Sequence, residues 1–195
     1  MKYMKFFCST FSSILLMIFI VGQANGQQVS WKRLSSISLK NTTGKKENLP
    51  GGELTVIVML SPECPLCRNY ISVINQLKLN NKQIQFYGIF PGSSYAVKEI
   101  ADFQKDYKVA FKLFIDPQKV LTKYLNATTT PECILLNKMG NIVYRGQIDN
   151  WAVSLGSQRK LITEKYLANA IDELLRNKNI AIKQTTPIGC MINDI

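Results

Sequence analysis

Two cysteines separated by two residues, in Cys64-Pro65-Leu66-Cys67, are the part of this 195-residue sequence best suited to chemistry. The run Leu54–Leu60 before them is apolar and β-branched at its centre, which predicts a strand buried on both faces. Pro65 suits a first helical position, and the spacing of apolar residues predicts a helix over 65–80. Because a helix N-terminus favours negative charge, we expect Cys64 to be an exposed thiolate of low pKa.

This spacing predicts thiol-disulfide chemistry. Cys67 lies one helical turn into the predicted helix, within reach of Cys64 for a disulfide, and such a pair can exchange electrons through a mixed disulfide on Cys64. A zinc site would need four ligands, and apart from Cys8 near the N-terminus only Cys133 and Cys190 are left to complete one with cysteines. A purely structural disulfide would add little stability, because the loop that it closes is so small.

The composition excludes other classes of mechanism. The sequence has no His, which removes imidazole-activated nucleophiles and His-ligated metal sites. With 46% hydrophobic and 19% charged residues, it is not a disordered chain. The net charge of +11 comes from scattered lysines and arginines without an arginine-rich stripe, so we expect a solvated basic surface and no nucleic-acid binding.

Residues 1–26 have the layout of a secretory signal peptide. A basic start precedes the uncharged apolar run Phe11–Val21, and the small residues Ala24 and Gly26 follow it. We expect export to a periplasmic or extracellular compartment, where thiols can be oxidised, with cleavage after Gly26. The alternative is an uncleaved leader that anchors the protein to a membrane, although the run is rather short for a spanning helix.

The rest of the chain alternates between strand and helix patterns, which is typical of an α/β fold. Further strands are predicted near 37–39, 84–90, 111–115, 133–136 and 142–145, and further helices over 93–107, 116–124 and 163–176. One domain from 31 to 176 therefore precedes a C-terminal extension, 177–195, in which no periodic pattern predicts an element.

The segment Ser61–Tyr70 after an apolar strand resembles the active-site segment of thioredoxin-like proteins. It is most similar to the redoxin branch, which includes alkyl hydroperoxide reductase/thiol-specific antioxidant-type domains and exported thiol-disulfide oxidoreductases. Thr129-Thr130-Pro131-Glu132 resembles the cis-proline segment of the same proteins. The resemblance covers 31–176 and implies a thioredoxin-like fold, with a central mixed β-sheet flanked by helices.

The resemblance also implies roles for individual residues. Cys64 would be the nucleophile and Cys67 the resolving thiol, while Thr130 and a cis Pro131 would shape the groove where a substrate docks. The expected activity is thiol-disulfide exchange with protein thiols and disulfides. No organic cofactor is implied, because the redox centre is the Cys64–Cys67 pair itself.

The sequence departs from the thioredoxin pattern in one respect and matches part of the peroxiredoxin pattern in another. Thioredoxins carry a buried acid in the strand before the two cysteines, whereas the run 54–60 has none, so Glu132 is our candidate for proton transfer, with a solvated acid as the alternative. Ser61-Pro62-Glu63-Cys64 copies part of the peroxiredoxin loop. The alternative activity is therefore that of a thiol peroxidase, an antioxidant enzyme acting on hydroperoxides.

Two further cysteines follow the pair. Cys133 lies in an apolar run and is expected to be buried as a small hydrophobic residue. Gly189-Cys190 resembles the C-terminal Gly-Cys element of a redoxin subgroup, and three hypotheses stand for Cys190. It is a third redox thiol, a soft ligand that binds copper(I) together with Cys64 and Cys67 in a non-enzymatic copper-handling module, or the disulfide partner of Cys133 or of another chain.

Overall fold

The computed structural model describes residues 29–192 of the chain. The predicted signal peptide, residues 1–26, lies outside this range and remains a prediction. Within 29–192, no helix is both long enough and apolar enough to cross a membrane.

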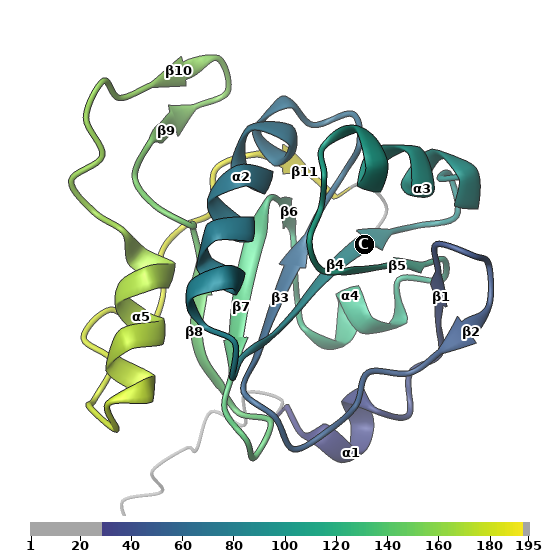
Figure 1. The fold of residues 1–195 in the computed structure, drawn as a ribbon, viewed down its shortest axis with the longest axis horizontal. Coiled ribbons are helices and arrows are strands. Elements are labelled where there is room, and N and C mark those ends of the chain that lie inside the picture. Colours follow the sequence, from purple (N-terminus) through teal and green to yellow (C-terminus); the bar gives the residue numbers. More distant parts are fainter. Residues whose placement is uncertain (1–28, 193–195) are drawn as a thin grey trace, which may run out of the picture.

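A seven-stranded mixed sheet forms the centre of the molecule (Figure 1), in the order β2-β1-β5-β4-β3-β7-β8. The three central strands β3, β4 and β5 are parallel, whereas β1 and β7 run antiparallel to the strands that they meet. The strands are β1 Leu39–Asn41, β2 Lys46–Glu47, β3 Thr55–Met59, β4 Gln85–Pro91, β5 Lys112–Asp116, β7 Glu132–Leu136 and β8 Ile142–Gly146. This mixed sheet and the helices beside it confirm the predicted α/β fold.

Helices cover both faces of the sheet and divide the core into two clusters. They are α1 Trp31–Leu34, α2 Pro65–Asn80, α3 Val97–Asp106, α4 Val120–Tyr124 and α5 Tyr166–Leu175. Because side chains alternate along a strand, Val56 and Val58 pack with α2, α3 and α5, whereas Ile57 and Met59 pack with α1 and α4. All of β3 is therefore buried, as the apolar run 54–60 predicts.

Four short strands lie outside the main sheet: β6 Thr129–Thr130, β9 Ala152–Ser154, β10 Ser157–Gln158 and β11 Cys190–Met191. Strands β9 and β10 form a hairpin between β8 and α5, and β11 pairs antiparallel with β6. The described part of the C-terminal extension thus crosses back over the fold, and its strand β11 lies beside β6 and near α2 (Figure 1), although the sequence predicts no element there.

The helix over 65–80 is confirmed with the predicted bounds, but the three other predicted helices begin later than predicted, the last of them at Tyr166 and not at 163. The helix predicted from 93 begins at Val97, because Ala96 is extended and the backbone at Gly92 has a φ of +109°. The helix predicted from 116 begins at Val120. The carboxylate of Asp116 accepts hydrogen bonds from the backbone N–H groups of Val120 and Thr122, at 3.0 and 2.8 Å, and so caps the helix from outside it.

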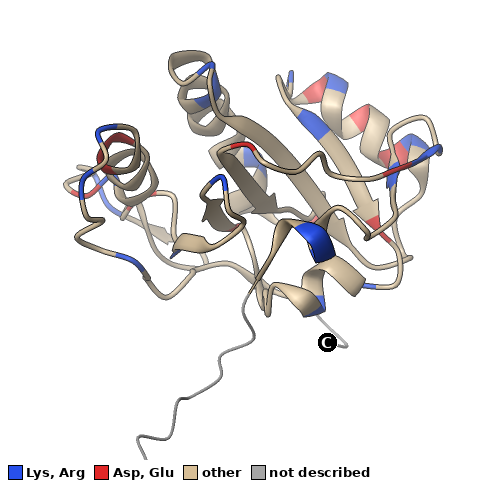
Figure 2. Ribbon diagram, turned by 90° about the horizontal axis from the view of Figure 1, so that it is seen from below, with Lys and Arg blue, Asp and Glu red and all other residues tan. Residues whose placement is uncertain are grey.

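Charged residues are dispersed over the elements (Figure 2), with acidic residues between the basic ones. Among the described residues, the buried ion pair joins Arg145 on β8 to Glu132 on β7. Arg145 also donates hydrogen bonds to the carbonyls of Leu125 and Asn126, at 3.1 and 2.9 Å, so this pair ties β7 and β8 to the segment that leads into β6. The absence of nucleic-acid binding remains a prediction.

Arg145→Ala should destabilise the fold, because it leaves the Glu132 carboxylate buried at 2% exposure without its cation. We expect the free energy of unfolding to fall by on the order of 3 kcal/mol, the lower end for breaking a buried ion pair, because the Arg145 side chain is itself 21% exposed. Urea unfolding measures the loss. Lys98→Ala is the control, because it breaks only the exposed pair with Asp102, and it should leave the urea midpoint unchanged. Equal effects of the two variants would contradict the prediction.

Candidate active site

Cys64 and Cys67 lie where β3 gives way to α2. Cys64 is the N-cap of α2, with extended backbone angles (φ −78°, ψ 115°), and Pro65 occupies the first helical position, as predicted. Cys67 lies in the first turn, where its sulfur accepts a hydrogen bond of 3.4 Å from the backbone N–H of Ser61. The end of a buried strand and the start of a long helix therefore fix both sulfurs.

The two thiols have opposite acidities. The pKa of Cys64 is lowered to about 5, chiefly because the Cys67 thiol donates a hydrogen bond to the Cys64 thiolate, and a second bond from the Cys190 thiol adds to the effect against the opposing influence of burial. Burial raises the pKa of Cys67 well above its ordinary value, and its bond to Cys64 raises it further. At neutral pH the reduced pair thus holds one thiolate and one thiol.

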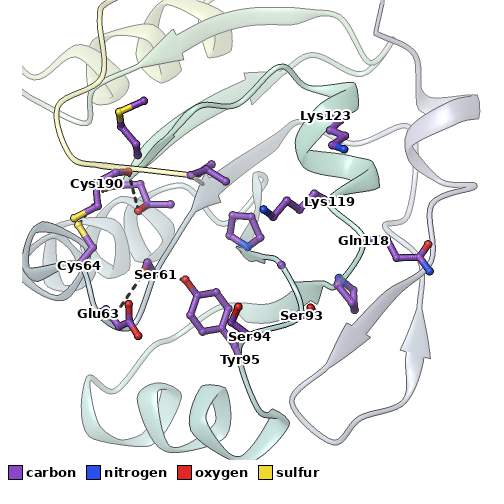
Figure 3. Close-up of a pocket in the computed structure, with 16 residues that line it drawn as sticks. Ser61, Glu63, Cys64, Ser93, Ser94, Tyr95, Gln118, Lys119, Lys123 and Cys190 are labelled. Carbon is purple, nitrogen blue, oxygen red and sulfur yellow. Dashed lines mark hydrogen bonds between the residues drawn. The ribbon is translucent and has the colours of Figure 1, made fainter. Parts of the chain in front are cut away.

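The prediction that Cys64 is exposed is wrong. Cys64 is only 1% exposed, because the strand β11 lies over it and the Cys190 side chain points toward it (Figure 3). Cys190 itself is half-buried and is the more accessible of the two sulfurs. The sequence identified the thiol of low pKa and offered Cys190 as a candidate third thiol, but it did not predict that a strand around Cys190 covers Cys64.

The predicted docking residues lie directly beside Cys64. The Thr130–Pro131 peptide bond is cis, as predicted, and both residues are buried. The Cys64 sulfur lies 3.1 Å from the carbonyl oxygen of Thr130, to which the protonated thiol donates. The structure therefore brings Thr130 and Pro131 together with the cysteine pair, as a docking role requires, and that role remains a prediction.

Glu132 lies apart from the cysteines. Its side chain is on the sheet face of Ile134 and Leu136, whereas Cys64 and Cys67 pack on the opposite face. Its carboxylate is bound by Arg145 and accepts a 3.1 Å hydrogen bond from the backbone N–H of Thr128. The geometry assigns Glu132 a structural role in holding the cis-proline segment and does not support proton transfer with the cysteine pair.

Cys133 is fully buried, as expected, and its thiol lies 3.1 and 3.3 Å from the carbonyl oxygens of Gly146 and Gln147. Burial raises its pKa well above the ordinary value. A protonated, enclosed thiol of this kind is inert, so Cys133 is a packing residue of β7.

Sequence reasoning missed a second side of the site. An open cavity of about 710 Å³ adjoins Cys64, and Ser61, Tyr95, Lys123 and Cys190 are among the residues that line it (Figure 3). The Tyr95 hydroxyl donates a 3.2 Å hydrogen bond to the hydroxyl of Ser61. The Gly-Ser-Ser sequence before Tyr95 was the available signal, since it favours a loop over the helix predicted there.

Within residues 29–192, no three side chains of the His, Cys, Asp and Glu types are arranged to hold a metal ion. Copper binding by the cysteines therefore remains a hypothesis that rests on their chemistry alone.

A CxxC pair at the start of a helix, beside a cis-proline and on a mixed sheet flanked by helices, defines the thioredoxin-like class of proteins. Residues 32–145 match the AhpC/TSA family, and the chain belongs to that family. Its members are generally oxidoreductases. The predicted resemblance to the redoxin branch is thereby confirmed.

Solved structures share this fold at low sequence identity. A hypothetical protein from Sinorhizobium meliloti matches with a TM-score of 0.70 and 21% identity, over 80% of this chain and 88% of that one. An uncharacterized conserved protein from Geobacillus kaustophilus matches with a TM-score of 0.70 and 22% identity, over 80% and 87%. A secreted Mycobacterium tuberculosis disulfide oxidoreductase matches with a TM-score of 0.51 and 20% identity, over 57% and 82%. No curated protein matches the sequence.

The reduced protein should lose thiolate absorbance in the ultraviolet as the pH falls through about 5, where Cys64 becomes protonated. Cys67→Ala should raise this midpoint toward the ordinary value of 9.0, because it removes the largest stabilising hydrogen bond, and Cys190→Ala should raise it less. Cys133→Ala is the control and should not change it. A midpoint that stays the same in Cys67→Ala would contradict this account of the site.

Proposed function

We propose that this protein is an exported thiol-disulfide oxidoreductase that exchanges electrons with partner proteins through Cys64 and Cys67. The observation that carries the proposal is the placement of the CxxC pair at the start of α2, with the Cys64 sulfur 3.1 Å from the carbonyl oxygen of Thr130 beside the cis Pro131. The lowered pKa of Cys64 and the raised pKa of Cys67 agree with it. The thiolate is the nucleophile in disulfide exchange, and a thiolate of low pKa is also a good leaving group.

The reaction with a partner disulfide has two steps. The Cys64 thiolate attacks one sulfur of the partner, a bond forms between them, and the partner's other sulfur leaves and takes up a proton. The Cys67 thiol then loses its proton and attacks the Cys64 sulfur, which releases the partner's first sulfur as a thiol. Two electrons pass to the partner, and the protein holds a Cys64–Cys67 disulfide. With a dithiol partner the same steps run in reverse.

The surroundings of Cys64 suit a protein partner. Thr130 and Pro131 lie against the reactive sulfur, and the open cavity adjoins it on the side of Tyr95. We propose that this region takes the cysteine-bearing segment of a partner. The redox-active pair needs no organic cofactor.

Cys64→Ser should abolish reduction of a protein disulfide by the leaderless protein, because no nucleophile remains. Cys67→Ser combined with Cys190→Ser should retain the first step and accumulate the mixed disulfide on Cys64, because neither neighbouring thiol is left to release it. Mass spectrometry detects this mixed disulfide. Cys133→Ala should retain full activity. Activity that survives in Cys64→Ser would overturn the proposal.

The same variants separate the alternative functions. Consumption of hydroperoxide that survives Cys67→Ser but not Cys64→Ser would indicate a thiol peroxidase, an activity that the AhpC/TSA family also includes. Tight, stoichiometric copper(I) binding by the reduced protein, without turnover of disulfides, would indicate a copper-handling module.

Expression of the full chain should yield an exported protein that begins at Gln27, because the signal-peptide pattern predicts cleavage after Gly26. N-terminal sequencing of the exported protein checks the site. Protein that stays in the membrane fraction with its leader attached would show an anchor instead.

A further inference from the structure

The C-terminal tail follows a defined path to the active site. It first runs beside β8, where the backbone N–H of Arg145 donates to the carbonyl of Lys183 and the N–H of Thr185 donates to the carbonyl of Arg145, both at 3.0 Å. The approach depends on Gly146, which has a φ of +131° and where an added Cβ would lie 2.2 Å from the hydroxyl oxygen of Thr185. The tail therefore packs so closely against β8 at Thr185 that only a glycine fits at position 146.

The tail then pairs with the cis-proline segment. Cys190 is opposite Thr130 in the antiparallel ladder of β11 and β6, and the N–H of Ile192 donates to the carbonyl of Thr128 at 2.8 Å. An added Cβ at Gly189 would lie only 2.1 Å from the carbonyl oxygen of Thr130. The tail therefore pairs with the backbone of β6 at very close approach, and this approach requires a glycine just before Cys190.

This pairing places Cys190 over Cys64. The Cys190 thiol donates a hydrogen bond to the Cys64 thiolate, which helps to raise the pKa of Cys190 to about 11, although burial raises it most. Cys64 therefore has two thiol neighbours, the fully buried Cys67 below it and the half-buried Cys190 on the solvent side.

We propose that Cys190 is a second disulfide partner of Cys64, carried by a tail segment (187–192) that occupies the docking edge in place of a partner protein. The docking edge is β6 together with Pro131. The segment must leave β6 before another chain can reach Cys64, because Cys64 is covered while β11 is in place. This inference rests on the proposed function, since it requires Cys64 to be the redox-active thiol.

Once Cys64 carries a mixed disulfide with a partner, Cys190 can displace the partner without any further oxidant. The Cys190 thiol loses its proton and attacks the Cys64 sulfur, the bond to the partner breaks, and the partner leaves as a thiol. Cys67 can next lose its proton, attack Cys64 and release Cys190 as a thiol, a disulfide exchange without net oxidation. The tail is thereby freed by the formation of the Cys64–Cys67 bond.

The geometry disfavours a Cys133–Cys190 disulfide. Cys133 is fully buried with its sulfur directed at the carbonyl oxygens of Gly146 and Gln147, whereas Cys190 faces Cys64. A link to another chain would require Cys190 to leave β6. Both pairings are outcomes of the experiment below.

The first test uses Cys67→Ser, treated with a small-molecule disulfide and mapped without reduction. We expect a Cys64–Cys190 disulfide within one chain and release of the reagent as a thiol. In the matched control Cys67→Ser/Cys190→Ser, the reagent should stay bound to Cys64. A reagent that persists on Cys64 while Cys190 is present, or a bond from Cys190 to Cys133 or to another chain, overturns the inference.

The second test displaces the tail without removing a thiol. Gly189→Ala should raise the alkylation rate of Cys64 in the reduced protein by roughly tenfold or more, the change that a loss of about 1.4 kcal/mol in tail binding produces. Met191→Ala is the control, because its side chain on the same strand is 79% exposed, and it should leave the rate unchanged. Far-ultraviolet circular dichroism verifies that Gly189→Ala is folded. An unchanged rate in the folded variant overturns the inference.

The two proposals fail separately. Activity in Cys64→Ser refutes the exchange function itself. Normal exchange through Cys64 and Cys67, with no Cys64–Cys190 bond and no effect of Gly189→Ala, refutes only the role of the tail.

Discussion

The hydrogen bond from the Cys67 thiol to the Cys64 thiolate is the interaction on which the site depends. It requires two sulfurs at a fixed separation, and the first turn of α2 sets that separation because Pro65 begins the helix directly after Cys64. The buried strand β3 fixes where the helix begins. Cys67 is fully buried and keeps its proton, whereas Cys64 loses its proton and is charged. This asymmetry determines that Cys64 is the sulfur that attacks first.

A second set of contacts holds the cis-proline segment against that thiolate. Glu132 follows Pro131 and is bound by Arg145, whose backbone also holds the tail at Lys183 and Thr185. One residue on β8 therefore supports the segment that faces Cys64 and the tail that covers it. Glu132, a candidate for chemistry when the sequence is considered alone, contributes through this support and not through proton transfer.

The sequence predicted those parts of the fold that are marked by a repeating apolar pattern or by a motif of fixed spacing. The apolar run of β3, the helix over 65–80 and the position of the CxxC pair follow from local patterns, whereas the cis Pro131 was implied by the resemblance to thioredoxin-like proteins. The structure confirms all of them. The sequence could not predict the burial of Cys64. That burial comes from β11, a two-residue strand with no periodicity, whose place is decided by backbone contacts to β6 and by the lack of a side chain at Gly189. Tyr95 was missed for a related reason, because its position depends on where α3 begins.

The hold of the tail on β6 has a consequence for selectivity. A segment attached to the same chain competes at an effective concentration on the order of millimolar, far above that of most free proteins. A peptide that matched only the backbone of β6 would therefore lose the competition. A successful competitor must gain binding energy elsewhere, and the cavity beside Tyr95 is the adjoining surface that the tail leaves open. Under the proposed exchange with partner proteins, the appended strand sets a threshold affinity that a partner must exceed to reach Cys64.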